Sequence, residues 1–416
     1  MKNIAVIGSG IAGLTSAYLL SKKHNVTVFE KNEYIGGHTA TIDIEYNNEK
    51  LAIDTGFIVF NDRTYPNFLK LMADIGVGRQ ETEMSFSVHN AETGFEYNGH
   101  NIDTLFAQRS NILRPKFWHL IREILRFNKQ CKFEYEQGLK VEDKTLGDFL
   151  SEHNFSRFFA EHYILPMGAA IWSSSIEEME AFELKFFIRF FVNHGLLNIA
   201  DRPQWYVVPG GSKQYIAPLT ETFKENIVLN AAIEKITRQQ GKVQIHFADG
   251  VQEFDEIVLA CHSDQALNLL GDANAEEKSV LSSIPYTANS VVLHTDISLL
   301  PKRKKAWASW NYQLSESRTS PASVTYNMNI LQGLENATTF CVTLNQDEAI
   351  DDSKVIRKFV YHHPVFNKKS MAAQLQRETI CGKNNTHFAG AYWYNGFHED
   401  GVRSAVDVGK RFGCEL

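Results

Sequence analysis

The sequence predicts a mixed fold, in which a parallel α/β sheet is joined to an inserted part with both helices and strands (α/β plus α+β). Three observations support this. Residues 2–8 (KNIAVIG) and 26–30 (VTVFE) are short apolar runs, typical of strands buried on both faces of a parallel sheet. The helix-like segment LTSAYLLSKK separates them. An apolar strand pattern returns at 254–261 and another near the C-terminus, so we expect the chain to rejoin this sheet after a long insertion.

The turn after the first strand is a glycine motif. Residues 8–13 read GSGIAG and have the spacing GxGxxG. Gly8 permits a tight turn, Gly10 lets backbone approach a pyrophosphate, and Gly13 lets the helix pack against its strand. The helix N-terminus offers free N–H groups and a positive dipole end to phosphates. Glu30 lies 20 residues after Gly10, where a carboxylate accepts hydrogen bonds from ribose hydroxyls, so the stretch predicts a dinucleotide site.

Composition narrows the class of protein. The 416 residues allow two or three domains, and a net charge of −7 argues against a general nucleic-acid binder. The five cysteines show no CxxC spacing, which fits a reducing compartment without a disulfide framework, and no metal site is expected. No run of about 18 uninterrupted apolar residues occurs. The first strand begins at once and leaves no room for a signal peptide, so we expect a cytoplasmic protein.

Two further stretches are candidate parts of the site. Gly36-Gly37 is a second turn suited to lie near phosphates, and His38 and Thr39 add hydrogen-bond donors beside it. Residues 51–62 (LAIDTGFIVFND) place a glycine turn between two apolar runs. That glycine either lets backbone approach a flat ring or marks an ordinary bend between strands.

The order of the remaining signals suggests a discontinuous architecture. We expect residues 1–75, 203–265 and 383–416 to form the nucleotide-binding domain, and 76–202 and 266–382 to form a substrate domain. The block 76–200 is expected to be mainly helical. The predicted elements are a helix at 64–79, a hairpin at 84–102, helices at 115–135, 145–163 and 177–199, a helix at 213–224, a three-stranded meander at 226–239, 242–250 and 254–261, a short helix at 264–270, a strand-rich part at 286–345, and a partly helical part at 351–380.

A single GxGxxG motif leaves two alternatives for the dinucleotide, namely NAD as a substrate or FAD as a resident cofactor. The chain resembles the flavin-containing amine oxidase superfamily in GSGIAG, Glu30, Gly36-Gly37, IDTG (53–56) and FAGAYWYNGFHEDG near the C-terminus. Within it, the chain is most similar to bacterial predicted NAD/FAD-binding proteins that resemble the N-terminal flavoprotein segment of plant cyclopropane-fatty-acid synthases. That closer resemblance rests on DTGFIVFNDRTYPN, AIWSSS, RFFVNHGLL, RPQWYVVPGGSKQY and GFHEDGVRS.

The resemblance implies a Rossmann-like domain of the glutathione-reductase type that binds FAD, and it assigns residues to the cofactor. The loop AYWYNGFHEDG has no cysteine, so noncovalent binding is expected. Many members of the superfamily have Arg at the position of His38, so pairing with pyrophosphate here is expected to depend on pH. The implied contacts are Gly8, Ser9, Gly10, Ile11, Ala12 and Gly13 at the pyrophosphate, Glu30 and Lys31 at the ribose, Gly36, Gly37, His38 and Thr39 along the phosphates, Thr55, Gly56 and Phe57 beside the flavin ring, Ile233 at the adenine, Gly390 and Ala391 at the ribityl chain, and Glu399, Asp400, Gly401 and Val402 at the flavin N1–O2 edge.

The substrate is less explicit in the sequence. Amine oxidases of the superfamily often place a Lys near the flavin N5, and no equivalent Lys is identifiable here. The resemblance implies instead dehydrogenation of a fatty-acyl or other lipid substrate. The alternatives are a flavin amine oxidase, or a noncatalytic FAD-binding partner of a lipid-modifying methyltransferase. His194 and His398 are the candidate acid/base residues, with a purely structural role as the alternative for each.

Basic and aromatic residues alternate in the predicted helix 115–135 and around 184–191. Such a pattern either places a helix at a membrane surface, here the inner face of the membrane, or combines a domain core with a solvated charged face.

Overall fold

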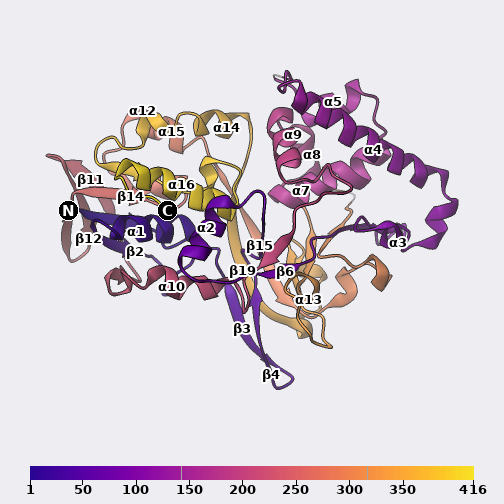
Figure 1. The fold of residues 1–416 in the computed structure, drawn as a ribbon, viewed down its shortest axis with the longest axis horizontal. Coiled ribbons are helices and arrows are strands. Elements are labelled where there is room, and N and C mark those ends of the chain that lie inside the picture. Colours follow the sequence, from indigo (N-terminus) through magenta and orange to yellow (C-terminus); the bar gives the residue numbers. More distant parts are fainter. Residues whose placement is uncertain (142, 316) are drawn as a thin grey trace.

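The computed structural model describes residues 1–141, 143–315 and 317–416. Two lobes lie side by side (Figure 1). One lobe contains both termini, α1 (Ile11–Ser21) and α16 (His398–Arg411), and the other is largely helical and contains α4 (Pro115–Glu136). In the described part of the chain no helix is both long enough and apolar enough to cross a membrane.

A five-stranded parallel sheet forms the centre of the first lobe, with the order β10-β2-β1-β14-β20. Ile4 and Val6 of β1 pack against α1 and α16, whereas Ala5 and Ile7 pack against a second, antiparallel sheet on the other face. Both faces of β1 are therefore buried, as the apolar run predicts. The strands are β10 (Ile227–Val228), β2 (Asn25–Phe29), β1 (Asn3–Ile7), β14 (Glu256–Leu259) and β20 (Thr386–Phe388).

The covering sheet consists of β11 (Lys235–Gln239), β12 (Lys242–Phe247) and β13 (Gly250–Phe254). The meander predicted from 226 to 261 is therefore confirmed at 235–239 and 242–247, but its first predicted strand is divided between two sheets and most of its last belongs to the parallel sheet. Residues 227–228 join the parallel sheet as β10, and so does β14, whose Ile257, Val258 and Leu259 are fully buried. A strand that is apolar on both faces fits only inside the covered parallel sheet.

A seven-stranded sheet with the order β19-β15-β18-β17-β16-β7-β8 connects the two lobes. The predicted hairpin at 84–102 is confirmed as β7 and β8, but these strands extend the sheet built from 286–364. The interpretation of 351–380 as partly helical missed β19, an edge strand whose charged residues face solvent. The strands are β19 (Val355–Pro364), β15 (Tyr286–His294), β18 (Cys341–Leu344), β17 (Val324–Asn327), β16 (Trp310–Gln313), β7 (Phe86–His89) and β8 (Glu96–Asn98).

The helical lobe is built on a core rich in phenylalanine, including Phe127, Phe159 and Phe187. The helices predicted at 145–163 and 177–199 are each interrupted. The first is interrupted after residue 152, where Asn154 adopts a left-handed conformation (φ 51°), and the second is divided into two helices by residues 181–183. The helices are α3 (Ile102–Leu105), α4, α5 (Leu146–Glu152), α6 (Arg157–Phe159), a π-helical turn (Ala160–Ile164), α7 (Leu165–Trp172), α8 (Ile176–Glu180) and α9 (Leu184–Asn193).

Short elements complete the chain. Two small sheets pair β3 with β4 and β9 with both β5 and β6. The remaining strands and α-helices are β3 (Thr41–Tyr46), β4 (Glu49–Asp54), β5 (Val59–Asn61), β6 (Gln80–Thr82), β9 (Trp205–Val207), α2 (Pro66–Asp74), α10 (Ile216–Thr220), α11 (Ser263–Leu269), α12 (Ala275–Leu281), α13 (Met328–Leu331), α14 (Lys368–Gln374) and α15 (Arg377–Ile380).

Candidate functional site

The glycine turn lies between the carboxyl end of β1 and the start of α1. Gly8 has a left-handed conformation (φ 100°). A Cβ on Gly13 would lie 1.9 Å from the Gly8 carbonyl oxygen, so only glycine fits there. A Cβ on Gly10 would meet no heavy atom within 4 Å. The turn is thus closed towards the sheet and open on the side of Gly10, where a ligand can approach the backbone.

The first turn of α1 offers unpaired N–H groups. Gly10 caps the helix without a side chain, and no acidic residue lies in the first turn. The first helical bond of this turn is donated by Leu14 N–H to the Gly10 carbonyl, at 2.9 Å. Ile11 and Ala12 are 8% and 6% exposed, so their amides have little access to water. A diphosphate would satisfy these amides and the positive end of the helix dipole.

Glu30 is buried at the end of β2, beside the glycine turn. Its Oε2 accepts hydrogen bonds from Ser9 N–H (2.9 Å) and Ser9 Oγ (2.6 Å). Its Oε1 accepts from the backbone and side-chain N–H groups of Asn32, at 2.9 and 2.8 Å. Two of these four donors belong to side chains that can rotate away, so ribose hydroxyls can take their places. Lys31 is exposed beside this group.

The second glycine turn lies directly against the first. Gly36 forms a bridge with Gly10, and a Cβ on Gly37 would lie 3.2 Å from the Gly10 Cα. This close approach carries His38 and Thr39 into the region that the open side of Gly10 faces. The predicted role of residues 36–39 as a continuation of the phosphate site therefore fits the geometry.

A cluster of imidazoles surrounds His38. Its ring centroid lies 5.7 Å from that of His363 on β19 and 6.4 Å from that of His262, which follows β14. The ring of Tyr361 lies 5.2 Å from His38, and His362 lies 6.3 Å from His262. Among the described residues, none forms a hydrogen bond with the buried Nε2 of His38.

His38, His262 and His363 are uncharged at neutral pH. Burial, together with the neighbouring imidazoles, lowers the pKa of His38 and of His262 to about 4 and that of His363 to about 3. The unsatisfied Nε2 of His38 therefore fits a polar or anionic ligand group between the two glycine turns and β19. The sequence reasoning named only His38. The sequence offered two signals for the other histidines of the cluster. One is the adjacent pair His362-His363, and the other is His262, which closely follows the buried strand β14.

Residues 55–57 line the same region from the opposite side. A Cβ on Gly56 would lie 2.2 Å from the His38 carbonyl oxygen, and Phe57 N–H donates to that oxygen at 2.7 Å. Thr55 Oγ1 lies 2.9 Å from Tyr361 Oη. The glycine is therefore required for a close contact with the backbone of His38, and its approach to a flat ring stays a prediction.

Asp54 fixes the position of this turn. Its carboxylate accepts hydrogen bonds from Thr41 Oγ1 (2.5 Å) and from the N–H and Oγ of Ser212, both at 2.9 Å. Burial raises the pKa of Asp54 to about 6. The interaction links the end of β4 to the PGGS turn at 209–212, two stretches that the sequence reasoning treated separately.

His398 is enclosed rather than open to a substrate. Its ring stacks on Phe57, with centroids 3.6 Å apart and planes 4° apart. Its Nε2 lies 2.8 Å from Tyr215 Oη and 3.2 Å from Thr39 Oγ1. Burial lowers the pKa of His398 well below its ordinary value. These contacts suit a residue that positions Phe57 and Thr39. The sequence reasoning did not identify Tyr215 as the hydrogen-bond partner of His398.

The N-terminal turn of α16 packs against that of α1. A Cβ on Gly401 would lie 2.7 Å from Ile11 Cγ2. Glu399 accepts hydrogen bonds from the N–H groups of Asn67 and Phe68, at 3.1 and 2.9 Å. Burial raises the pKa of Asp400 to about 7, and its carboxylate accepts from the N–H of residue 397. Two helix N-termini thus converge on one region, and Val402 is fully buried behind them.

Three remaining predicted residues lie at the edges of this region. Gly390 N–H donates to Ser404 Oγ at 2.8 Å, which ties the end of β20 to α16, and Ala391 follows it. Ile233 was predicted within the meander but lies in the loop before β11. That loop is held to Glu30 by a hydrogen bond from Ala231 N–H to the Glu30 carbonyl, at 2.8 Å.

His194 belongs to a separate cavity of about 160 Å³ between the helical lobe and the seven-stranded sheet. His194 Nδ1 lies 3.0 Å from the Phe190 carbonyl oxygen, so Nδ1 carries the proton and Nε2 keeps its lone pair. Burial lowers the pKa of His194 to about 4. The cavity is lined by Met84, Ser85, Phe86, Tyr97, Gly99, Tyr163, Met167, Ile171, Phe190, His194, Gly195, Leu196, Arg202, Pro203, Trp205 and Trp310.

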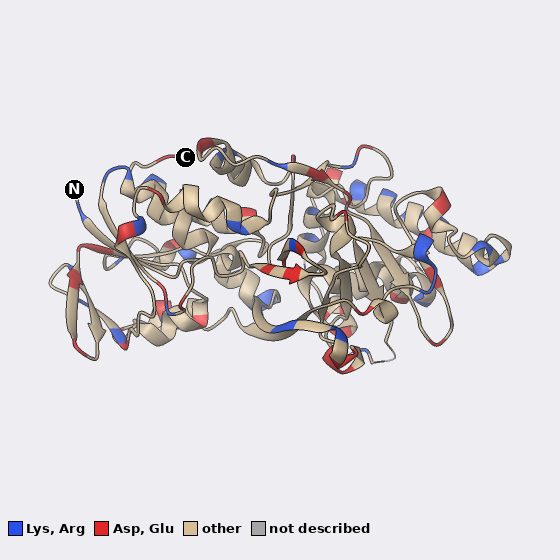
Figure 2. Cartoon of the chain, turned by 90° about the horizontal axis from the view of Figure 1, so that it is seen from below, with Lys and Arg blue, Asp and Glu red and all other residues tan. Residues whose placement is uncertain are grey.

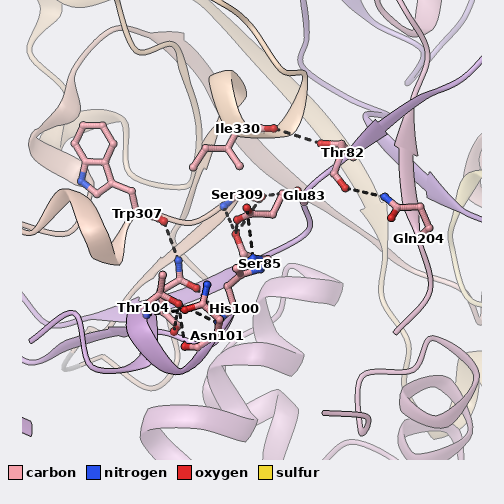
Figure 3. A network of polar contacts seen from close by, with 11 residues as sticks. Thr82, Glu83, Ser85, His100, Asn101, Thr104, Gln204, Trp307, Ser309 and Ile330 are labelled. Atoms are coloured by element: carbon pink, nitrogen blue, oxygen red, sulfur yellow. Dashed lines mark hydrogen bonds and ion pairs between the residues drawn. The ribbon is translucent and has the colours of Figure 1, made fainter. Parts of the chain in front are cut away.

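Aromatic contacts connect the cavity to the first region. Phe397, the residue before His398, lies 5.8 Å from the ring of His194 and 5.2 Å from that of Phe190. At the cavity wall that contains Ser85, a network of polar contacts stabilises the surrounding backbone (Figure 3). There Ser85 Oγ accepts a hydrogen bond from Ser309 N–H at 3.0 Å. The structure therefore places His194 beside Phe397 and His398 against Phe57, in different surroundings.

Comparisons with known proteins identify the family. A profile described as "Flavin containing amine oxidoreductase" matches residues 11–328. A 1-hydroxycarotenoid 3,4-desaturase from Flavobacterium sp. is 53% identical over 45 residues, which are 11% of this chain and 9% of that protein. The chain spans about half or less of the length of the curated relatives that it matches.

Solved structures agree with the fold. A CLA-producing fatty acid isomerase from P. acnes superposes with a TM-score of 0.70 at 17% identity, over 99% of this chain and 98% of that one. Cyclohexylamine oxidase from Brevibacterium oxydans superposes with a TM-score of 0.71 at 14% identity, over 99% of both chains. These structures share the mixed α/β fold of the chain, and the profile match shows that the chain belongs to the family of flavin-containing amine oxidoreductases.

Proposed function

We propose that the chain binds one FAD noncovalently and removes a hydride from a hydrophobic substrate, for which a fatty-acyl chain is the best candidate. The observation that carries the substrate class is the cavity at His194. Its lining is largely apolar and includes the cation of Arg202, and none of the lining residues in the described parts of the chain carries a carboxylate. Such a site favours an apolar chain with an anionic end over an ammonium ion.

The cofactor assignment is supported by the two converging helix N-termini, the open side of Gly10 and the buried Nε2 of His38. In this proposal the amides of α1 hold the diphosphate, and Glu30 holds the adenosine ribose. The first turn of α16 would face the N1–O2 edge of the ring. Burial raises the pKa of Cys261, beside this cluster, to about 12, so its thiol is a poor nucleophile for a covalent link.

A bound flavin supplies the chemistry by accepting a hydride from a substrate C–H bond. The protein contributes orientation and the exclusion of water. Aromatic side chains such as Phe190 and Trp310 shield the cavity from solvent. His194 is neutral at pH 7, and its Nε2 is the candidate group to accept a proton from the substrate.

The size of the cavity bears on the substrate. A cavity of about 150 Å³ accommodates a group the size of benzene. At about 160 Å³, this cavity holds a segment of an acyl chain but not a whole long chain. The rest of the acyl chain would extend out of the cavity past Arg202, which is exposed. Because the Nε of Arg202 donates to the Asn198 carbonyl at 3.0 Å, its terminal nitrogens remain to bind a carboxylate.

A flavin amine oxidase is the second candidate. Tyr163, Phe190, Trp205 and Trp310 place several aromatic rings in one cavity, and aromatic rings attract organic cations. Cyclohexylamine oxidase also shares the fold. Among the described residues, the cavity lining contains no Lys, so the lipid substrate is the preferred candidate.

Anaerobic reduction of the bound flavin tests this proposal. Long-chain fatty acids, their methyl esters, cyclohexylamine and L-amino acids would be added separately to the holoprotein, and loss of the oxidised-flavin absorbance would be followed. We expect reduction by fatty acids. The variant Arg202→Gln should raise KM for the free acid but not for the ester. Reduction by amines alone would overturn the lipid assignment, and no reduction by any compound would favour a noncatalytic partner of a methyltransferase.

A further inference from the structure

Helix α4 presents apolar side chains on two opposite faces. One face packs into the lobe through Phe117, Leu120 and Phe127, which are at most 1% exposed. On the opposite face, Trp118 and Leu125 are each 46% exposed and Phe133 is 52% exposed. An ordinary surface helix needs only the first face. The second, exposed set therefore indicates contact with something other than water.

The exposed apolar residues form one stripe with cations between them. At 100° per residue, Trp118, Arg122, Leu125, Lys129, Lys132 and Phe133 fall within about 100° of the helix circumference. We call these six residues the α4 stripe. The preceding turn extends it, because Trp118 Nε1 donates to the Ile112 carbonyl at 2.8 Å, and the neighbouring Leu113 is 86% exposed.

Charge separates this region from the rest of the molecule. Residues 109–136, which include all of α4, contain seven Lys or Arg residues and three acids, while the whole chain has a net charge of −7. Of the acids, Glu123 is 3% exposed, and Glu134 and Glu136 lie in the last turn of α4, with Glu136 on the same side of the helix as Trp118. Within the described parts of the chain, no carboxylate lies within 4 Å of Arg122, Lys129 or Lys132. Figure 2 shows Lys and Arg recurring along the helices at the end away from both termini.

We propose that the α4 stripe docks the protein on the surface of an anionic lipid bilayer, with α4 parallel to the membrane plane. Helices that bind this interface combine Trp, Phe or Leu with Lys and Arg, since the apolar groups enter the acyl boundary and the cations meet the headgroups. A nucleic acid would use the cations but not the exposed leucines. The helix lies along the outer edge of its lobe, where a flat surface can reach it (Figure 1).

Vesicle binding tests the proposal independently of the substrate. Holoprotein would be sedimented with vesicles of equal parts phosphatidylglycerol and phosphatidylcholine, or of phosphatidylcholine alone, at about 0.1 M salt. We expect at least about tenfold stronger partition into the anionic vesicles. The triple variant R122E/K129E/K132E should lose at least about tenfold of that partition. The control variant K50E/K70E/K278E reverses three exposed lysines outside the helical lobe and has the same net charge as the triple variant. Its partition into anionic vesicles should stay within about threefold of that of the wild type.

The apolar contribution is tested separately with W118S/L125S/F133S. We expect this variant to lose the part of the binding that persists when salt is raised several-fold, because salt screens only the charges. Three results would each overturn the proposal. They are an equal loss of partition in both charge variants, equal binding to anionic and neutral vesicles, and binding to heparin and DNA without binding to vesicles. The midpoint of unfolding is measured for each variant to check that it folds. If R122E/K129E/K132E fails to fold, R122Q/K129Q/K132Q takes its place.

Discussion

The substitution His38→Arg is expected to tighten FAD binding at neutral and alkaline pH and to reduce its dependence on pH. In the structure His38 has a pKa of about 4 and an unpaired Nε2, so it is neutral at pH 7. A diphosphate beside Nε2 would favour the imidazolium and raise this pKa. Binding would then take up a proton, and the affinity should increase by up to about tenfold per pH unit as pH falls from 8 towards 5.

An arginine at this position carries its charge without taking up a proton. A hydrogen bond to a charged group contributes about 1.5–3 kcal/mol, which corresponds to roughly 10- to 150-fold in Kd. Desolvation of a cation among His262, His362 and His363 opposes this gain, so we expect the lower end, about tenfold at pH 8.

The assay is titration of flavin-free protein with FAD by flavin fluorescence at pH 8, 7, 6 and 5.5. His38→Gln serves as the neutral control and should gain no affinity at low pH. Asp400 has a pKa of about 7 and titrates in the same window, so the series is repeated in an Asp400→Asn background. A wild-type Kd that is constant from pH 8 to 6, or an Arg variant that binds no tighter than wild type at pH 8, would refute the reasoning. Failure of all variants to bind FAD would count against the cofactor itself.

Four further predictions concern the same molecule. Gly13→Ala should abolish flavin retention on purification, because its Cβ would lie 1.9 Å from the Gly8 carbonyl oxygen. Acid precipitation should release all flavin into the supernatant, whereas a yellow pellet would indicate a covalent link. His194→Ala should slow anaerobic flavin reduction about 100-fold while leaving FAD affinity unchanged; an unaltered rate would exclude His194 as the base. Arg377→Met should lower the free energy of unfolding by about 3 kcal/mol in urea titrations. Arg377 is 6% exposed, and its loss removes a donor from the Phe388 and Ser404 carbonyls and from Asp407 (2.9 Å), which keeps its hydrogen bond from Tyr394 Oη.

Local features of the fold could be predicted from the sequence. The strand, glycine turn and helix at 3–21 have the predicted form because turn geometry and burial on both faces depend on neighbouring residues. The same reasoning placed Gly36, Gly37 and Glu30 beside that turn. It failed at 226–261, where consecutive strands divide between two sheets, since strand pairing depends on partners far along the chain. It also missed β19, whose adjacent charged residues Arg357 and Lys358 suit an exposed edge strand as well as a helix.

The sequence by itself predicted a dinucleotide as the ligand, because the glycine turn, the acid at the end of β2 and their spacing are properties of one short segment. Only the tertiary structure decided which distant side chains meet there. His38, His262 and His363 come together because the end of β14 and the strand β19 face the second glycine turn. The cavity at His194 likewise combines residues from 84 to 310, through helix packing against a sheet whose strands come from both ends of the insertion. Such contacts follow from the order of strands and the packing of layers, which no local pattern specifies.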